Sequence, residues 1–260
     1  MKSVREIRHP ATEGIKLASL MHDGIKVCLV FPHGMGDVVM FRPVLNKLRD
    51  DYPNATIHMM TKSTLKELDD HDEDMVYDIS FWLDYTVATS GHPGFTKNTL
   101  CCANELGIQP PMDDLPIAKG GFRSPWVGVG CTSISMPHYQ PTAYECSEVN
   151  RGILDAGFIP LDLSFNTGDY AFPPVSPMAC DVRKVKGNYA MLAGAVERCF
   201  AFIGTFTGSF HVAQSLLPGR TLLLCPRAME WQRLFKREPL CINMRDITAK
   251  EITDWLKSLP

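Results

Sequence analysis

Short apolar segments alternate with amphipathic segments along the chain, and this pattern predicts strands that alternate with helices. The expected strands are 25–32, 55–60, 75–81, 126–131, 158–165, 200–204 and 221–225. The expected helices are 37–51, 63–68, 95–106, 143–156, 189–198, 209–216 and 249–259. Such alternation is typical of α/β proteins with parallel sheets.

Three segments, 1–24, 63–68 and 69–74, are expected to contain neither a strand nor a long helix. Residues 1–24 show neither periodicity, so we expect them to be irregular apart from a short hairpin near residues 12–14. Ser63 is expected to cap the helix that it begins. The acidic run 69–74 that follows this helix is expected to be a solvated turn.

A proline-rich stretch, 109–116, interrupts the pattern and is the best candidate for a linker. The alternation of strands and helices restarts after it. We therefore expect two Rossmann-like domains, 1–116 and 117–260, whose parallel sheets face a central cleft. The last helix, 249–259, has one apolar face, which either packs back on the first domain or contacts another copy of the chain. The oligomeric state is left open.

Composition and charge exclude several classes of protein. The 260 residues are 45% hydrophobic and 21% charged, with a net charge of −3, so nucleic-acid binding is not indicated. No apolar stretch approaches the roughly 20 residues that span a bilayer, and residues 1–10 lack the apolar core of a signal peptide. Nine cysteines without a C-x-x-C pair indicate a reduced, cytoplasmic protein. No Cys/His cluster has the spacing of zinc ligands, so no metal is expected.

Two glycine turns are the most informative feature, because each lies where a strand gives way to a helix. The first turn is 33–37, which follows strand 25–32, and the second is 207–211, which follows strand 200–204. Backbone N–H groups converge at a helix N-terminus, and the helix dipole favours negative charge there. The two turns are therefore candidate sites for a phosphate or another anionic group.

The first turn carries a carboxylate with two competing roles. Asp37 is either an ordinary helix cap or a general base that deprotonates an acceptor hydroxyl. Gly34 and Gly36, with His33 in the same loop, are expected to form the turn with positive φ and to let a substrate approach the backbone. Val39 stands where a dinucleotide fingerprint has its third glycine, so NAD binding is not favoured.

The second turn offers hydroxyl and N–H groups for a diphosphate. His211 either contacts the same phosphates or is a packed residue of the helix. Two hydroxyl residues after strand 126–131 occupy a comparable position, although a simple Ser/Thr turn explains them equally well. The candidate donor-binding residues are Thr132, Ser133, Thr207, Gly208, Ser209 and His211.

Two segments of the chain resemble motifs of one enzyme family. Residues 25–55 resemble the opening of the heptosyltransferase-like enzymes of glycosyltransferase family nine, with a Gly-Asp turn and a helix that closes on Leu-Arg and Pro-x-Ala. Residues 206–213 are similar to the family signature Asp-Thr-Gly-Pro-x-His-x-Ala, and Leu106 and Gly107 match a common Leu-Gly pair. The motifs occur in the family's order, so the resemblance covers most of residues 25–226.

This resemblance implies a GT-B fold with two Rossmann-like domains. The C-terminal domain would hold a nucleotide-diphosphate sugar, which is ADP-heptose in the best-known members, and the N-terminal domain would hold the acceptor. The resemblance also implies an inverting, metal-independent transfer without a cofactor. In that reaction Asp37 would be the general base, and Thr207, Gly208 and His211 would bind the donor.

The chain differs from the family pattern at residues that contact the donor in the family. Phe206 replaces an aspartate that contacts the donor sugar, and Ser209 replaces a proline. The family's Lys/Arg-Trp-Pro segment is absent, and 137–141 stands in its place. These differences favour a donor sugar or an acceptor other than those of the standard lipopolysaccharide reaction.

The sequence therefore predicts a glycosyltransferase that acts on a nucleotide sugar and on a glycan, lipid-linked or other hydroxyl acceptor. Two alternatives stay open. One is a non-catalytic protein that binds nucleotide sugars, and the other is a GT-B-fold epimerase or hydrolase that acts on the nucleotide sugar alone.

Overall fold

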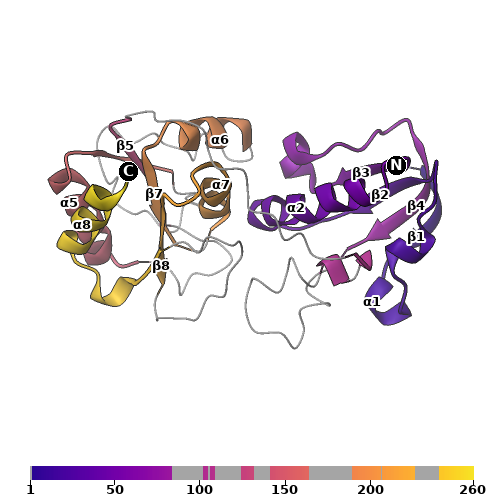
Figure 1. Ribbon diagram of the computed structural model, residues 1–260, viewed down its shortest axis with the longest axis horizontal. Coiled ribbons are helices and arrows are strands. Elements are labelled where there is room, and N and C mark those ends of the chain that lie inside the picture. Colours follow the sequence, from indigo (N-terminus) through magenta and orange to yellow (C-terminus); the bar gives the residue numbers. More distant parts are fainter. Residues whose placement is uncertain are drawn as a thin grey trace. The chain divides into compact units, whose positions relative to one another are not determined.

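The structure is a computed structural model of the 260-residue chain, which divides into two compact units. The residues that it describes are 2–83, 102–104, 106–108, 124–131, 141–163, 189–205, 207–225 and 240–260. Those up to 108 belong to the first unit, and those from 124 onward belong to the second. Each unit contains one parallel sheet with helices packed against it (Figure 1). The expected α/β class with two parallel sheets is confirmed.

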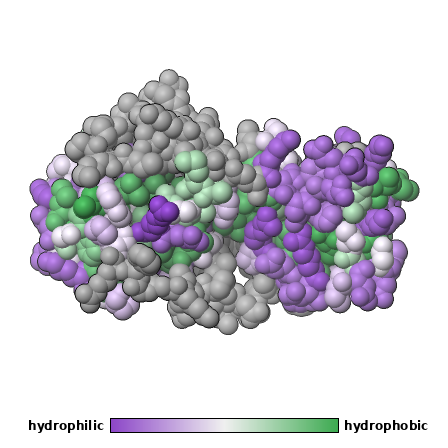
Figure 2. Space-filling view, turned by 90° about the horizontal axis from the view of Figure 1, so that it is seen from above, coloured by the Kyte–Doolittle hydropathy of each residue, from purple (hydrophilic) through white to green (hydrophobic). Residues whose placement is uncertain are grey.

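The first unit has a four-stranded parallel sheet in the order β1-β4-β2-β3. Its strands are β1 (Lys2–Ile7), β2 (Lys26–Val30), β3 (Thr56–Met60) and β4 (Val76–Trp82). Its helices are α1 (Pro10–Glu13), η1 (Leu17–Leu20), α2 (Met35–Asp51) and η2 (Ser63–Leu68). The face of this unit seen in Figure 2 is largely hydrophilic.

Helix α2 forms because its apolar residues recur at helical spacing and pack against the sheet. Val38, Leu45 and Leu48 are completely buried, and each such burial stabilises the fold by about 1.5–3 kcal/mol. Phe41 of α2 stacks on Phe31, which directly follows β2, with 4.6 Å between the ring centroids. These contacts fix the start of α2 close to the carboxyl end of β2.

The expectation of an irregular segment 1–24 is wrong. Residues Lys2–Ile7 form strand β1, which pairs in parallel with β4 at the edge of the sheet, and Gly14 ends helix α1 at φ 66° instead of forming a hairpin. An edge strand leaves most of its side chains exposed, and only Ile7 of β1 is buried. The strand therefore lacks the apolar period by which strands are found in a sequence.

The segment after β3 also differs from expectation. Residues 63–68 form a 3₁₀ helix with Lys62 at its N-cap, so Ser63 is not the cap. The carboxylates of Asp69 and Asp70 are not simply solvated, because they accept hydrogen bonds from the backbone N–H groups of Thr61 and Met59. Strand β3 is at the sheet edge, where these N–H groups have no partner strand.

The second unit has a five-stranded parallel sheet in the order β6-β5-β7-β8-β9. Its strands are β5 (Trp126–Gly130), β6 (Ile159–Asp162), β7 (Ala201–Gly204), β8 (Thr221–Cys225) and β9 (Leu240–Asn243). Its helices are α5 (Ala143–Asp155), α6 (Tyr189–Glu197), α7 (Gly208–Leu216), η5 (Met244–Asp246) and α8 (Ala249–Ser258). Strand β9 was not expected, because it is short and lies at the sheet edge.

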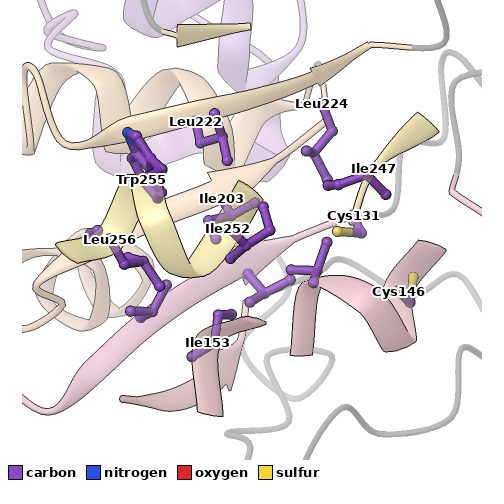
Figure 3. Packing of buried hydrophobic residues seen from close by; sticks show 14 of the residues in the cluster. Cys131, Cys146, Ile153, Ile203, Leu222, Leu224, Ile247, Ile252, Trp255 and Leu256 are labelled. Carbon is purple, nitrogen blue, oxygen red and sulfur yellow. The ribbon is translucent and has the colours of Figure 1, made fainter. Parts of the chain in front are cut away.

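The core of the second unit includes the apolar face of the last helix. Ile252, Trp255 and Leu256 of α8 belong to the same buried cluster as Ile153 of α5 and Ile203 of β7 (Figure 3). This face is therefore used within the second unit, whereas the sequence suggested the first domain or another copy of the chain. Helices α5 and α8 can approach closely because Gly152 has no side chain. A Cβ atom at this position would lie only 2.5 Å from the backbone oxygen of Ala249.

The other expected elements occur with small shifts at their ends, and strand 158–165 is shortened to β6. The linker 109–116 and the first part of helix 95–106 lie outside the described residues. Gly107, which was expected to end that helix, has a φ of +78°, as a glycine that follows a helix often does. None of the described helices combines the length and the apolar character that a membrane crossing requires.

Candidate functional site

Both predicted turns lie at the carboxyl end of a parallel strand and at the start of a helix. Helix α2 begins shortly after β2, and helix α7 begins shortly after β7. In each helix the N–H groups of the first turn have no acceptor within the helix, because no helical turn precedes them. These two helix starts are the candidate sites, and each is described within its own unit.

At the start of α2 the carboxylate of Asp37 caps the backbone. Gly34 is the N-cap, and its N–H group donates to Oδ2 of Asp37 over 3.1 Å. Asp37 thus makes the returning half of a capping box, a contact of the kind that contributes about 1 kcal/mol. The carboxylate is half-buried, which leaves it within reach of solvent.

The expectation of positive φ in this turn is wrong. Gly34 has a φ of −71° and the extended conformation that an N-cap adopts, and Gly36 lies inside the helix. The helix begins two residues earlier than the sequence indicated, at Met35 rather than Asp37, so the glycines are not needed for a left-handed turn. A Cβ atom at Gly34 would still lie 3.2 Å from Oδ2 of Asp37, so the glycine leaves room for the carboxylate.

His33 fastens the loop that leads into α2. Its Nε2 atom lies 3.2 Å from the carbonyl oxygen of Leu83, to which it donates, and Leu83 directly follows β4. The imidazole ring packs edge-on against Phe31, with 4.6 Å between the ring centroids. His33 therefore connects the carboxyl ends of β2 and β4 and holds the loop beside Asp37.

At the start of α7 two hydroxyl groups replace the carboxylate. Thr207 is the N-cap, and its Oγ1 accepts from the N–H group of Phe210 and lies 2.9 Å from Oγ of Ser209. The N–H group of His211 donates to the carbonyl of Thr207. Because these bonds use the N–H groups of Phe210 and His211, the N–H groups of Gly208 and Ser209 are the ones without a partner in the helix.

The side chain of His211 lies inside the second unit. It is 3% exposed, and burial lowers the pKa of its imidazole to about 4, although the Gln214 side chain favours the charged form. At neutral pH the ring is uncharged and can exchange hydrogen bonds, but it supplies no positive charge. The sequence left two roles open for His211, a phosphate contact or a packed residue of the helix. Its burial and neutral charge are those of a packed residue.

Two strand-terminal glycines permit close packing beside the start of α7, Gly130 against α7 itself and Gly204 against the neighbouring strand. A Cβ atom at Gly130, the last residue of β5, would lie 2.8 Å from Oγ of Ser209 and 2.7 Å from the Phe202 ring. A Cβ atom at Gly204, the last residue of β7, would lie 2.5 Å from the carbonyl oxygen of Gly130. Sequence reasoning missed this pair, although a glycine at the end of each strand before a Ser/Thr-rich turn was a visible signal.

Thr205 was also missed. Its N–H group donates to the carbonyl oxygen of Gly130 over 3.0 Å. Its hydroxyl is buried and makes no hydrogen bond with the residues that the structure describes. A buried hydroxyl without a hydrogen bond lowers the stability of the fold by about 1–3 kcal/mol. The carboxyl end of β7 therefore carries an unsatisfied polar group directly before the second turn.

Several predicted site residues cannot be placed. Thr132, Ser133 and Phe206 lie outside the described residues, as do residues 137–140. Within the described ranges, no group of three His, Cys, Asp or Glu side chains could hold a metal ion. The geometry of the candidate site therefore rests on the two helix starts and on the strand ends beside the second of them.

Neither the models of protein families nor the curated proteins give a match to the sequence. Solved structures do match. The glycosyl transferase family 9 protein from Veillonella parvula DSM 2008 is 14% identical with a TM-score of 0.54, over 92% of this chain and 90% of that chain. The ADP-heptose lps heptosyltransferase II of E. coli is 13% identical with a TM-score of 0.59, over 90% of this chain and 98% of that chain.

A third match is the E. coli heptosyltransferase WaaC, solved with ADP, at 10% identity and a TM-score of 0.56. The match covers 90% of this chain and 99% of that chain. At such identities the likeness concerns the fold. The chain therefore has the fold of the family 9 glycosyltransferases and heptosyltransferases, in agreement with the resemblance noted from its motifs.

Proposed function

We propose that this chain is a glycosyltransferase that moves a sugar from a nucleotide-diphosphate donor to an acceptor hydroxyl. The observation that carries the proposal is the start of α7, where the N–H groups of Gly208 and Ser209 lie at the carboxyl end of a parallel sheet. The fold shared with known glycosyltransferases supports the same reaction class. In this proposal the carboxyl ends of the two sheets face a common cleft, as in a GT-B enzyme.

The start of α7 is proposed to hold the donor diphosphate. Two N–H groups and the positive end of the helix dipole favour an anion, and the first turn contains no acidic residue that would repel it. As the sugar leaves, negative charge grows on the nucleoside diphosphate. Fixed N–H donors stabilise that charge without reorganisation, so a transfer that needs no metal ion is part of the proposal.

The start of α2 is proposed to hold the acceptor, with Asp37 as the general base. The carboxylate would accept the proton of the acceptor hydroxyl while the hydroxyl oxygen attacks the anomeric carbon. Attack on the face opposite the departing diphosphate would invert the configuration of that carbon. The cap from Gly34 supports this role because it holds the carboxylate at the loop that His33 fastens.

The first donor class to examine is suggested by the relatives. WaaC was solved with ADP, and heptosyltransferase II is named for ADP-heptose. An adenine nucleotide is therefore the first ligand to examine, and the replacements at Phe206 and Ser209 favour a sugar other than heptose. The acceptor is proposed to be a glycan, lipid-linked or other hydroxyl compound.

A thermal-shift screen with ADP, UDP, GDP, CDP and their sugar conjugates tests the donor site. A ligand that binds only the folded chain raises its stability by about 2.7 kcal/mol at 100 times the dissociation constant. Gly208→Pro removes one N–H group at the first helical position, where proline is tolerated, while Gly208→Ala retains it. We expect weaker binding in Gly208→Pro than in Gly208→Ala, since both add a Cβ atom and differ in the N–H group.

Turnover assays separate transfer from the alternatives. Transfer predicts that the donor is consumed only when an acceptor is present. Consumption without an acceptor would replace the proposal with hydrolysis or epimerisation, and binding without consumption across acceptors would replace it with a binding protein. If no nucleoside diphosphate raises the melting temperature, the donor site at α7 is wrong.

A further inference from the structure

Strand β1 forms one edge of the first sheet, where its partner is β4 (Figure 1). Residues 2–7 make no backbone hydrogen bond to any other described segment. Both faces of the strand are also poorly covered, because four of its six side chains are exposed and only Ile7 is buried. The outer edge of β1 therefore presents N–H and C=O groups with which a further strand can pair.

Strand β1 is the longest of the edge strands in the two described sheets. It has six residues, whereas β3 has five and β6 and β9 have four each. Strand β6 also contains Pro160, which has no N–H group to donate. Short length and proline are common ways to protect an edge, and β1 has neither feature. This strand is therefore the edge best suited to pairing with another chain.

The charges of β1 are complementary to those of its own copy. Side chains alternate along a strand, so Lys2, Val4 and Glu6 share one face, with opposite charges two positions either side of Val4. When a second β1 runs antiparallel with its Val4 opposite this one, Lys2 of each copy lies opposite Glu6 of the other. Charged side chains often protect an edge, but this arrangement matches itself under a two-fold rotation.

An exposed apolar pair lies on the same face. Val4 is 78% exposed and Val76 of β4 is 51% exposed, and no other large apolar side chain of the described part of the first unit is exposed. Val76 is opposite Lys2 in the register, so Val4 and Val76 are diagonal neighbours on one face. Antiparallel pairing centred on Val4 brings the two Val4 side chains together and extends this apolar patch across both copies.

The carboxylate of Glu6 is held in a position that leaves one oxygen for a second chain. Both Nε and Nη2 of Arg8 lie 2.8 Å from Oε2 of Glu6, and the guanidinium group lies 5.4 Å from the centre of the Trp82 ring. The other oxygen, Oε1, is the one that Lys2 of a second copy would meet. No described residue forms an ion pair with Lys2, so its ammonium group is available for this contact.

We propose that β1 pairs with β1 of a second copy in antiparallel orientation, so that the first sheets of two chains join into one sheet across a two-fold axis at Val4. The interface is small, with a six-residue strand and one apolar side chain from each copy, so the dimer dissociates reversibly on dilution. The pairing uses the first unit alone, and it does not depend on the proposed catalytic function.

Sedimentation velocity of the intact chain, without added residues before Met1, tests the association. We expect the unaltered chain to shift from monomer to dimer as its concentration rises. Lys2→Glu places two carboxylates opposite each other at both ends of the interface, and Glu6→Lys places two ammonium groups there. Each variant should raise the dissociation constant by about tenfold or more. Both positions are exposed, so the fold should be retained, and circular dichroism checks this.

Charge exchange between copies tests the antiparallel register. A mixture of Lys2→Glu chains with Glu6→Lys chains should recover a dimer, because each carboxylate then meets an ammonium group of the other chain. The double variant that carries both changes should recover it as well. The matched control is Lys66→Glu, which makes the same change of charge at an exposed position of η2. Its dissociation constant should equal that of the unaltered chain.

Hydrogen exchange locates the interface without any substitution. In the unaltered chain, N–H groups of residues 3–7 should exchange more slowly as the concentration rises, because those on the outer edge gain acceptors in the second copy. The N–H groups of α8 in the second unit should exchange at the same rate at every concentration.

Three results would overturn the proposal. The first is a chain that stays monomeric at its highest soluble concentration. The second is a dimer whose dissociation constant is the same in both single variants, since association then uses another surface. The third is a failure of the mixture and of the double variant to recover the dimer that the single variants lose. If the variants fail to fold, unchanged exchange of β1 in the unaltered chain overturns it as well.

Discussion

The first turns of α2 and α7 occupy equivalent places in their units but carry different chemistry. Each follows an inner strand of a parallel sheet and leaves backbone N–H groups without a helical partner. In α2 the carboxylate of Asp37 returns to cap Gly34, whereas in α7 the Thr207 hydroxyl caps Phe210 and no acidic residue is present. The same backbone element thus carries a carboxylate cap in one unit and a candidate anion site in the other.

The difference follows from where charge is placed at the positive end of each helix. A carboxylate in the first turn is attracted to the helix dipole by about 0.3–1 kcal/mol, and it occupies the field that an anion would use. Helix α7 is capped by neutral groups, and His211 in its first turns is neutral as well. The positive end of the α7 dipole is therefore not compensated by a charged side chain in its first turn. Four predictions follow from this contrast between α2 and α7.

The largest effect is expected for Asp37→Asn. A neutral amide cannot accept the acceptor proton, so turnover should fall by about 10²–10⁴-fold. The amide oxygen still accepts from Gly34, so the free energy of unfolding should change by less than about 1 kcal/mol. Steady-state kinetics and denaturant unfolding measure the two effects.

A matched control is Asp78→Asn. The Asp78 carboxylate also accepts a backbone N–H group, that of Lys26 over 2.8 Å, but it does so at the amino end of β2. Its replacement should leave turnover unchanged. Equal turnover losses in both variants, or full turnover in Asp37→Asn, would remove Asp37 as the general base.

The second prediction concerns the pH dependence contributed by α7. The pKa of His211 is lowered to about 4 in the folded chain, and the ordinary value is 6.5. Between these values the unfolded chain binds more protons, so stability should rise with pH across this window and be fully present above it. The expected span is on the order of 3 kcal/mol.

Urea unfolding at several pH values tests this expectation, with His211→Gln compared with the unaltered chain. The variant should lose the rise between about pH 4 and 6.5, while replacement of the exposed His22 by glutamine should retain it. An unchanged rise in His211→Gln would show that the imidazole is not buried in its neutral form.

The third prediction compares Gly130, which packs against the start of α7, with Gly34 at the start of α2. In Gly130→Ala the new Cβ atom would meet the Phe202 ring and Oγ of Ser209, so we expect a loss of about 1–3 kcal/mol in the free energy of unfolding. Gly34→Ala meets only the Asp37 carboxylate, at 3.2 Å, and the φ of −71° suits alanine. Its loss should stay below about 1 kcal/mol. Equal losses in denaturant unfolding would contradict the close approach of α7 to β5.

The smallest effect is expected for the caps. Thr207→Ala and Thr248→Ala each remove a hydroxyl that accepts a first-turn N–H group, in α7 and in α8, and each should cost about 1 kcal/mol. Only Thr207→Ala should also weaken the binding of a nucleoside diphosphate, as measured by calorimetry. Equal affinities of the two variants for the nucleoside diphosphate would show that the Thr207 hydroxyl has no part in ligand binding.

The sequence predicts the inner strands well because burial on both faces produces apolar runs. Strand β8 occurs at the expected residues, and α2 ends where expected. The edge strands β3 and β6 were also expected, whereas the edge strands β1 and β9 were not. The solvated turn expected at 69–74 is right for the exposed residues 72–74 but not for Asp69 and Asp70, whose carboxylates bond to N–H groups along the edge of the sheet.

The site was predicted in part. Glycine and hydroxyl residues after apolar runs located both helix starts, and the two roles of Asp37 were recognised. The cap on Gly34 is now observed, and the role as a base stays a prediction. The fit of Ser209 against Gly130 and the burial of His211 could not be foreseen, because both depend on how strands that are far apart in the sequence come together.

The carboxylates of Asp69 and Asp70 have a consequence for association between molecules. A free edge of a sheet can recruit a strand from another chain, and this is a common route to aggregation. The N–H groups of Met59 in β3 and of Thr61, which directly follows β3, already donate to these carboxylates. The acidic segment therefore closes this side of the sheet against growth by an added strand.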